Sequence, residues 1–381
     1  MPSMDGRFKV IKISKITTRE GLLATIQGKK ADRIPFFMED IFLPHGQVER
    51  EARNNGLGIY RKCPSMTTTL EKVHITSSRI RTDERKATTF IYETPVGTVS
   101  QTTLDAKPFK GRLDGIGGGI TEYFVKRPED WDVLKFIAEN TSYQPYYDRF
   151  AYFKKLLGDD GIVSSVVGYH TAYTKLLIDW VGTTRLYVDH VKYPEKVDEI
   201  LETITKNQEK QYPIAVEAPT DFFEVGDHID DVFIKPSAFE KYILPVHNKF
   251  ARMAHSKGKI TAIHCDGRLN GLKDLIGELE HDIIHAITPL PIGNLPIKEA
   301  LEVWPNKILW INFEYYNMGL KAMQKKLLDL LRSVIPGYRV VFGPSTERWV
   351  PPEYLRLLTK ILSQATLPLT EEKIKKIENS L

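Results

Sequence analysis

The stretch Ile260-Thr261-Ala262-Ile263-His264-Cys265-Asp266-Gly267 is a β-rich run that ends in a histidine and an aspartate before a glycine. Side chains two positions apart project from the same face of a strand. We therefore expect His264 and Asp266 to converge and Cys265 to face the other way. Such a pair suggests metal ligands, although a structural hydrogen-bonded pair gives the same pattern.

Similar short apolar runs recur along the chain, and helical patterns fill most of the intervals between them. The runs are 33–40, 162–168, 222–227, 259–266, 282–288, 308–313 and 338–343. Near-continuous apolar strands alternating with helices indicate a parallel sheet covered on both faces. With an eighth strand expected within residues 85–105, an α/β fold of the closed (β/α)8 TIM barrel type is the economical solution. An open doubly wound sheet is the alternative.

The composition fits a large globular protein in a reducing compartment. The chain has 381 residues, 42% of them hydrophobic, and a net charge of only +4, which argues against a nucleic-acid partner. Cys63 and Cys265 are the two cysteines, too few for a disulfide framework. Neither a signal peptide nor a membrane-spanning stretch is recognisable. We expect a cytoplasmic protein with no membrane partner, and a homodimer is one of the oligomeric states left open.

The whole chain, residues 1–381, is interpreted as one barrel domain with an N-terminal extension. Residues 64–125 interrupt the strand–helix rhythm and are rich in Thr, Ser, Gly and Arg. Within them, residues 86–102 predict a β-hairpin that turns at Pro95-Val96-Gly97. The glycine-rich run 115–119 lacks the ending of a phosphate loop. We therefore expect a hairpin and loop insertion near the barrel mouth.

Polar residues gather at the carboxyl ends of the expected strands. They are Glu39, Asp40, Tyr169, His170, Glu224, Asp227, His264, Asp266, His285, Asn312, Glu314 and the run Ser345–Glu347. Active sites of (β/α)8 enzymes are built at that rim. The sequence therefore predicts one polar site at the barrel mouth.

Six segments form a recognisable series, and they are Gly226-Asp227, Pro236–Tyr242, Gly258-Lys259, His264–Gly267, Ala286–Pro289 and Leu309–Phe313. In their order and spacing they resemble the superfamily of uroporphyrinogen decarboxylases and cobalamin-linked methyltransferases, and the resemblance runs from Lys29 to Pro352. The resemblance implies a (β/α)8 barrel. The decarboxylase branch has an arginine-rich first strand, where this chain has the acidic Phe37-Met38-Glu39-Asp40-Ile41. An acidic pocket would repel a polycarboxylate substrate.

In the methyltransferase branch of this superfamily, an H-x-C pair at the end of the fifth strand and a cysteine at the end of the eighth hold zinc. The related cobalamin-independent methionine synthases add an acidic ligand from the sixth strand. On this chain the resemblance implies the zinc ligands His264, Asp266, His285 and Glu347. Imidazole and carboxylate ligands make a harder site than thiolates, suited to chemistry at oxygen. A hydrogen-bonded core histidine at 285 and a surface ion pair at 347 are the competing interpretations.

Together with the resemblance, these residues favour a zinc-dependent methyltransferase. It would move a methyl group from a small-molecule oxygen donor, such as a methoxylated aromatic compound, to the corrinoid of a separate protein. The chain has no recognisable D-x-H-x-x-G corrinoid-binding motif, so we expect the corrinoid on a partner protein. The expected catalytic residues are Asp227 and His170, and the expected substrate-binding residues are Glu39, Tyr169, Glu224 and Asn312. Phe223, Phe313, Tyr315 and Tyr316 would suit a flat ring.

Three other functions stay open from the sequence. One is a methylcobamide:thiol methyltransferase on the same fold. Another is a metal-free lyase like uroporphyrinogen decarboxylase, in which Asp40 or Asp227 stabilises a protonated intermediate. The third is a barrel that binds a ligand or a corrinoid protein without turnover.

Overall fold

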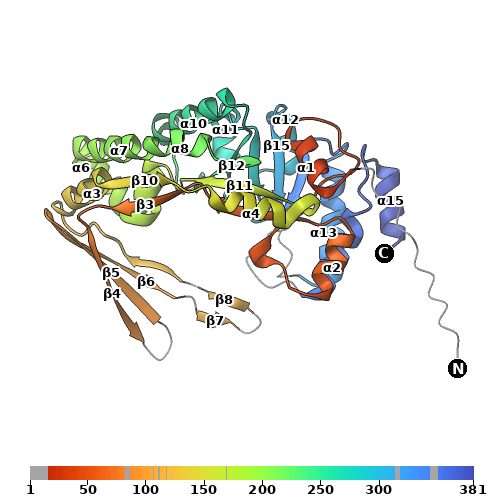
Figure 1. The fold of residues 1–381 in the computed structure, drawn as a ribbon, viewed down its shortest axis with the longest axis horizontal. Helices are drawn as coiled ribbons and strands as arrows, with labels where there is room; N and C mark the ends of the chain where they lie inside the picture. The colour runs from red at the N-terminus through yellow and green to blue at the C-terminus, as the bar shows by residue number, and fades with distance from the viewer. Residues whose placement is uncertain are drawn as a thin grey trace.

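The computed structural model describes residues 16–81, 86–105, 107–109, 112–116, 118–168, 170–313, 318–343 and 351–381. Its centre is an eight-stranded parallel sheet with helices outside it (Figure 1). In spatial order the strands are β1 (Phe37–Glu39), β2 (Gly58–Pro64), β11 (Gly161–Val167), β12 (Phe222–Val225), β13 (Thr261–His264), β14 (Ile283–Ile287), β15 (Ile308–Asn312) and β16 (Val340–Gly343).

The two outermost strands of this sheet meet, so the sheet nearly closes into a barrel. Phe36 and Phe342 form a parallel bridge, and the Phe342 amide donates to the Pro35 carbonyl at 2.9 Å. Each neighbouring pair of strands between them is parallel. The predicted (β/α)8 barrel is thereby confirmed.

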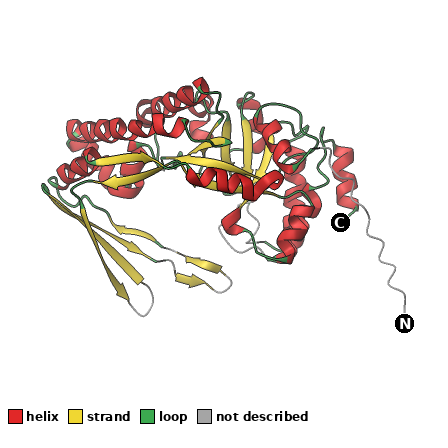
Figure 2. Ribbon diagram, viewed as in Figure 1, coloured by secondary structure: helices red, strands yellow, loops and turns green. Residues whose placement is uncertain are grey.

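Helices connect the strands and cover the outside of the sheet (Figure 2). They are α1 (Thr18–Ile26), α2 (Gln47–Asn54), α3 (Asp130–Glu139), α4 (Asp148–Leu157), α5 (Ala172–Thr174), α6 (Thr183–Lys192), α7 (Pro194–Gln208), α8 (Tyr212–Val216), α9 (Pro236–Ala238), α10 (Leu244–Ser256), α11 (Lys273–Gly277), α12 (Ile297–Val303), α13 (Leu320–Ser333), α14 (Pro352–Leu362) and α15 (Glu371–Asn379). Two π-helical turns, Lys175–Trp180 and Phe239–Ile243, continue α5 and α9. Within the described residues, no helix has the length and apolar character needed to cross a membrane.

The second barrel strand is not where the sequence predicted it. Residues 86–104 belong to a separate antiparallel sheet, whereas β2 pairs with β1 and β11 in the barrel. β2 escaped recognition because Arg61 and Lys62 interrupt its apolar pattern. Both charged side chains are paired, Arg61 with Asp40 and Lys62 with Glu39, which offsets the cost of placing them there.

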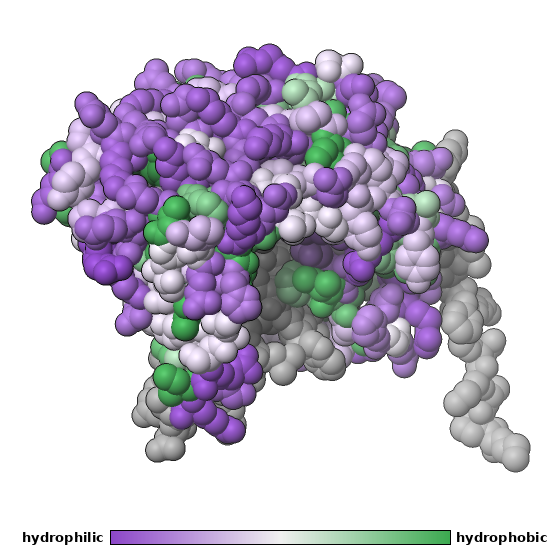
Figure 3. Space-filling model, turned by 60° about the vertical axis from the view of Figure 1, so that its left-hand side comes forward, coloured by the Kyte–Doolittle hydropathy of each residue, from purple (hydrophilic) through white to green (hydrophobic). Residues whose placement is uncertain are grey.

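The chain between β2 and β11 builds antiparallel sheets that extend away from the barrel as an arm (Figure 1). Its strands are β3 (Met66–Leu70), β4 (His74–Arg81), β5 (Lys86–Thr94), β6 (Gly97–Leu104), β7 (Lys107–Phe109), β8 (Arg112–Ile116), β9 (Gly119–Glu122) and β10 (Thr141–Pro145). The predicted hairpin is confirmed, since Thr94 of β5 pairs with Gly97 of β6. Figure 3 shows a hollow between the arm and the rest of the molecule, with hydrophobic residues on part of its wall.

Helix α1 seals the barrel at the amino ends of the strands. Leu22 and Ile26 pack with the interior layer of Phe37, Tyr60, Ile162, Phe222, Ala262, Ile283, Ile308, Trp310 and Val341. Arg19 fixes the helix by donating to the Gly161 carbonyl at 2.9 Å and to Asp221 at 2.8 Å. Burial of each large aliphatic side chain contributes about 1.5–3 kcal/mol. The barrel interior is thus filled at the amino ends of the strands, and it stays open at their carboxyl ends.

Candidate active site

A cavity of about 540 Å³ opens at the carboxyl ends of the barrel strands. We call it the main cavity. Its ionisable lining consists of Glu39, Lys62, His170, Glu224, Asp227, His228, His264, Asp266 and His285. Aromatic side chains form its floor, because the His285 ring lies 5.0 Å from Trp310 and 5.9 Å from Tyr60 between centroids. A set of titratable groups therefore rests directly on the apolar barrel interior.

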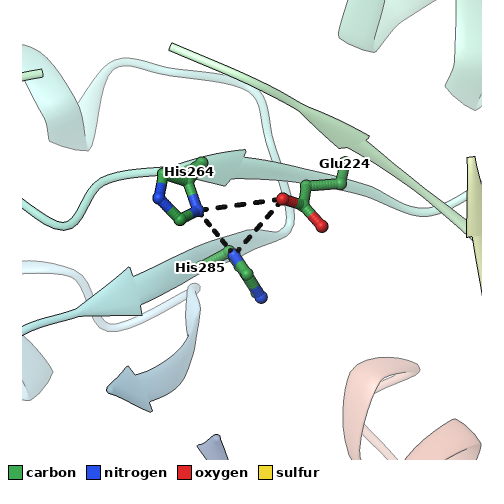
Figure 4. Close-up of side chains that lie close together, drawn as sticks. All are labelled: Glu224, His264 and His285. Carbon is green, nitrogen blue, oxygen red and sulfur yellow. Dashed lines mark hydrogen bonds and ion pairs between the residues drawn. The ribbon is translucent and has the colours of Figure 1, made fainter. Parts of the chain in front are cut away.

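Three of these side chains converge on one point (Figure 4). One ligand atom each from Glu224, His264 and His285 lies within 4.8 Å of the others. His264 Nδ1 and His285 Nδ1 are 3.0 Å apart, and each lies 3.8 Å from Glu224 Oε1. We call these residues the triad.

Strand register brings the triad together. His264 of β13 pairs directly with His285 of β14, while Glu224 of β12 pairs with Ala262, two residues before His264. Residues two apart share a strand face, so all three side chains enter the barrel. Cys265 is fully buried in the outer core, which confirms the predicted alternation along 264–266.

A backbone irregularity follows His285. The pairing of β14 with β15 shifts register between His285 and Ile287, and Ala286 between them has a φ of 65°. A residue with a side chain rarely adopts positive φ, and a bulge redirects neighbouring side chains. Alternation from the interior residue Ile283 places His285 in the cavity, and the bulge after it lets Ile287 return to the outer core.

Glu224 is a buried carboxyl group whose hydrogen-bonding and charge partners offset only part of the cost of its burial. Burial raises its pKa to about 7, and the charge of Glu39 adds to this while His264 opposes it. Lys62 Nζ lies 3.1 Å from Oε1, but Oε2 has no hydrogen-bond partner among the described residues. Leaving such an oxygen unpaired costs free energy unless a ligand satisfies it. Glu224 therefore has coordinating capacity to spare.

The pKa values of the two histidines shift in opposite directions. Burial, reinforced by the charges of His264 and Lys62, lowers the pKa of His285 well below its usual value, which keeps a ring lone pair available. Burial also lowers the pKa of His264, but Asp266 and Glu224 outweigh it and the net shift is upward. Asp266 Oδ2 lies 3.6 Å from His264 Nε2, on the opposite side of the ring from the triad. Asp266 is thus placed to orient the His264 ring.

The triad fits a metal ion. Donor atoms of a tetrahedral zinc site with bonds of 2.0–2.1 Å stand about 3.3 Å apart. The observed separations of 3.0 Å and 3.8 Å bracket that value. The donor set of two imidazoles and a carboxylate is one that zinc takes. Glu224, His264 and His285 can therefore hold a metal.

Asp227, although only three residues after Glu224, belongs to a separate buried network. Its Oδ1 accepts hydrogen bonds from Thr174 Oγ1 and, at 2.9 Å, from the His228 amide. Its Oδ2 lies 3.0 Å from His247 Nε2, and His247 Nδ1 lies 3.0 Å from His281 Nε2. Burial alone would raise the pKa of Asp227, yet the His247 contact brings it below its usual value. Both carboxylate oxygens are occupied within the protein.

The remaining predicted residues divide into three groups. Glu39 and Asn312 line the main cavity, where Glu39 pairs with Lys62 at 3.3 Å. His170 lines it too, and its Nδ1 lies 2.8 Å from Asp179 Oδ2. Tyr169 and Glu347 fall outside the described residues, as do Glu314–Tyr316 and Ser345-Thr346.

The aromatic lining differs from the prediction. Phe223 faces outward and stacks edge-on against Phe250 of α10 at 5.5 Å between centroids, because its neighbours 222 and 224 face inward. Phe313 lies in the outer core. The described aromatic lining of the main cavity is instead Phe37, Phe42, Tyr60 and Trp310. Lys62 was also missed, because its strand was not recognised.

Comparison with known proteins agrees with this architecture. Residues 114–289 match the family model of uroporphyrinogen decarboxylase (URO-D). The superfamily resemblance predicted from the sequence is thereby confirmed. No curated protein matches the sequence.

Solved structures share the fold at low identity. A methyltransferase from Methanosarcina mazei aligns with a TM-score of 0.50 and 14% identity, over 90% of this chain and 97% of its own. A B12-independent methionine synthase from Shewanella sp. W3-18-1 aligns with a TM-score of 0.42 and 11% identity, over 87% and 86%. At these identities the first likeness shows a common fold, and the second is too weak to carry an argument.

Proposed function

We propose that this URO-D-type protein is a zinc-dependent methyltransferase. It takes a methyl group from an oxygen donor, a methoxylated aromatic compound, and passes it to the corrinoid of a separate protein. In that reaction the carbon–oxygen bond breaks, a carbon–cobalt bond forms at the reduced corrinoid, and the donor oxygen gains a proton. The triad, with its buried and incompletely paired Glu224, is the observation that carries the proposal.

We assign the zinc to Glu224, His264 and His285, with Glu347 kept as a further ligand that only the sequence suggests. Asp266, predicted as a ligand, is assigned to orient His264 through the other ring nitrogen. Zinc bound there would act as a Lewis acid on the donor oxygen. The absence of thiolates from the assigned ligands favours oxygen over sulfur substrates, which argues against thiol methylation.

The other residues of the main cavity bind and orient the donor. Phe37, Tyr60 and Trp310 offer an apolar surface beneath the triad for an aromatic ring. His170 is assigned the proton transfer to the departing oxygen, because it lines the main cavity and Asp179 holds its ring in place. Asn312 Oδ1 has no hydrogen-bond partner among the described residues and is assigned to the substrate.

A decarboxylase-like lyase is the second candidate, since the matched family model bears that name. Two observations weigh against it. The carboxylates Glu39, Glu224 and Asp266 line the main cavity and would repel a polycarboxylate substrate. Asp227 is occupied by its buried network, and Asp40 is paired with Arg61.

The test is a methyl-transfer assay with the full chain, a cobalt(I) corrinoid protein and a methoxylated aromatic compound. We expect optical formation of methylcobalt with release of the phenol, and loss of both after treatment with a chelator. Re-addition of zinc should restore the rate. Rapid methylation of a simple thiol from methylcobalt, with no demethylation of any aryl ether, would contradict the proposal.

A further inference from the structure

A second cavity of about 430 Å³ lies beside the main cavity. We call it the side cavity. Val166 and His170 line both cavities, so the two share a wall at the end of β11. The side cavity lies between the barrel and the base of the arm, and its apolar lining includes Met66, Leu70, Tyr92, Phe124, Trp180 and Ile204.

The two cavities differ in charge. The main cavity is lined by Glu39, Glu224, Asp227 and Asp266. Among the described residues that line the side cavity there is no carboxylate, and its basic groups are Lys175 and His170. The main cavity also contains Lys62 and four histidines, so its carboxylates are partly offset, whereas no carboxylate among the described lining residues of the side cavity offsets Lys175. An anionic group is therefore better placed in the side cavity.

Lys175 is the cation of the side cavity. Its ammonium lies 5.0 Å from the centre of the Trp180 ring, and both residues belong to the same π-helical turn. Asp179 Oδ2 is 4.0 Å away, beyond hydrogen-bond distance, and also contacts His170 at 2.8 Å. Burial lowers the pKa of Lys175 despite Asp179. A ligand anion would compensate that desolvation.

Ser65 adds a polar group to the same lining. The residue is fully buried at the end of β2, and its hydroxyl has no hydrogen-bond partner among the described residues. Buried polar groups are normally paired, so an unpaired one in a cavity wall indicates a place where a ligand can bond.

We propose that the side cavity binds the apolar, carboxylate-bearing end of the methyl donor. Lys175 pairs with the carboxylate, Ser65 offers a further hydrogen bond, and Trp180 and Phe124 pack against the hydrocarbon. The opposite, methoxy-bearing end then reaches the triad past His170. This inference rests on the proposed function for the identity of the reacting end, and it names the donor class as aryl or arylalkyl carboxylates.

Calorimetric titration of the full chain with 3-(4-methoxyphenyl)propanoate and with its primary amide tests the inference. The two probes differ in charge and little in shape. We expect the acid to bind at least about tenfold more tightly than the amide, which corresponds to about 1.4 kcal/mol. Lys175→Gln should abolish this preference, and Lys175→Arg should retain it. Lys206→Gln, which changes an exposed lysine of α7, should bind both probes as the unchanged protein does.

Each titration is repeated with a chelator, because a carboxylate bound by a metal would also favour the acid. An acid preference that survives Lys175→Gln, or vanishes with the chelator alone, would overturn the side-cavity assignment. Ile204→Phe provides a second test. By narrowing the side cavity it should weaken the binding of both the acid and the amide, and it should leave the binding of the shorter methoxybenzene unchanged. Equal weakening of all three would also overturn it. Neither titration involves methyl transfer, so failure of the proposed reaction is distinguishable from failure of this site.

Discussion

Two buried carboxyl groups at the end of β12 behave in opposite ways. Glu224 and Asp227 are both almost inaccessible to solvent, yet the pKa of Glu224 is raised to about 7 and that of Asp227 is lowered. Asp227 has partners on both oxygens, whereas one oxygen of Glu224 lacks a partner among the described residues. Burial alone therefore does not identify a functional carboxylate. The difference lies in whether the protein itself completes the bonding.

The Asp227 network stabilises the fold around the site. The triad instead lowers the free energy of unfolding, because it leaves donor atoms unpaired and available to a ligand. The first is closed by Thr174, His228 and His247. The second is completed only by a ligand. Changes in the two regions should therefore separate into effects on stability and effects on metal binding.

The largest expected effect follows from His264→Ala. Removal of a triad imidazole should lower zinc affinity by more than about 100-fold, because loss of an outer partner of a ligand already costs 10- to 100-fold. The fold should persist, since the side chain lies at the open barrel mouth. Zinc affinity is measured by competition with a chromophoric chelator.

Asp266→Asn is the matched comparison for His264→Ala. It keeps the size of the side chain and acts only on the opposite ring nitrogen. We expect a fall of about tenfold in zinc affinity. Equal losses in the two variants would make Asp266 a ligand, as the sequence first suggested.

The next largest effect concerns stability. His247→Leu removes the partner of Asp227 and should lower the free energy of unfolding by about 3–5 kcal/mol, the cost of leaving a buried charge unpaired. Zinc content should be unchanged. Urea denaturation and elemental analysis measure the two quantities.

His255→Gln serves as the control for His247→Leu. It breaks the half-exposed pair with Asp282, and such surface pairs contribute about 0–1 kcal/mol. Loss of zinc in His247→Leu at unchanged secondary structure would show that the two carboxylate regions are not independent.

A pH dependence should distinguish Glu224 in the metal-free protein. Its folded-state pKa of about 7 exceeds the ordinary value of 4.5, so between these values the folded chain holds a proton that the unfolded chain releases. Its contribution to stability is complete below pH 4.5 and is lost as the pH rises toward 7. Glu224→Gln should abolish this decline, on the order of 3 kcal/mol. Zinc affinity should rise over the same range, because the metal needs the carboxylate.

Urea denaturation of chelator-treated protein at pH 5 and pH 8, with and without Glu224→Gln, measures this effect. Subtracting the pH dependence of the Glu224→Gln variant from that of the unchanged protein removes the contributions of all other titrating groups. Identical pH dependence in both would show that Glu224 is not the group responsible.

A smaller effect is expected at the bulge of β14. Ala286→Gly should stabilise the chain by about 1 kcal/mol, because glycine adopts the observed φ of 65° without steric cost. Ala286→Val should destabilise it by more than that and weaken zinc binding by displacing His285. Thermal unfolding and zinc titration report the two effects. Tolerance of valine with full zinc affinity would disprove the role given to the bulge.

The smallest effect is expected at Cys265. Cys265→Ala should leave zinc binding unchanged, because this side chain lies in the outer core, and should cost about 1 kcal/mol of stability. Elemental analysis and denaturation are the measurements. Loss of zinc here would mean that the strand faces are assigned the wrong way round.

Much of this arrangement was predictable from strand periodicity. The run 260–267 placed His264 and Cys265 on opposite faces, and the polar residues after seven apolar runs located the barrel mouth. Paired charges hid the eighth strand, since Arg61 and Lys62 look exposed in sequence and are held by Asp40 and Glu39 in the structure.

The composition of the triad was harder to predict. Glu224 and Asp227 both follow the same apolar run, and sequence alone cannot tell which oxygen atoms the protein satisfies. His247 and His281, which help to decide this for Asp227, lie in α10 and ahead of β14, far from the predicted rim. Side-chain contacts between distant elements carry information that local patterns lack.

The most direct test of the triad is the metal content of the purified chain, determined by elemental analysis beside Glu224→Gln and His247→Leu. The account predicts about one zinc per chain in the unchanged protein and in His247→Leu, and a large loss in Glu224→Gln. No metal in the unchanged protein after growth with zinc, or full zinc retention in Glu224→Gln, would contradict it.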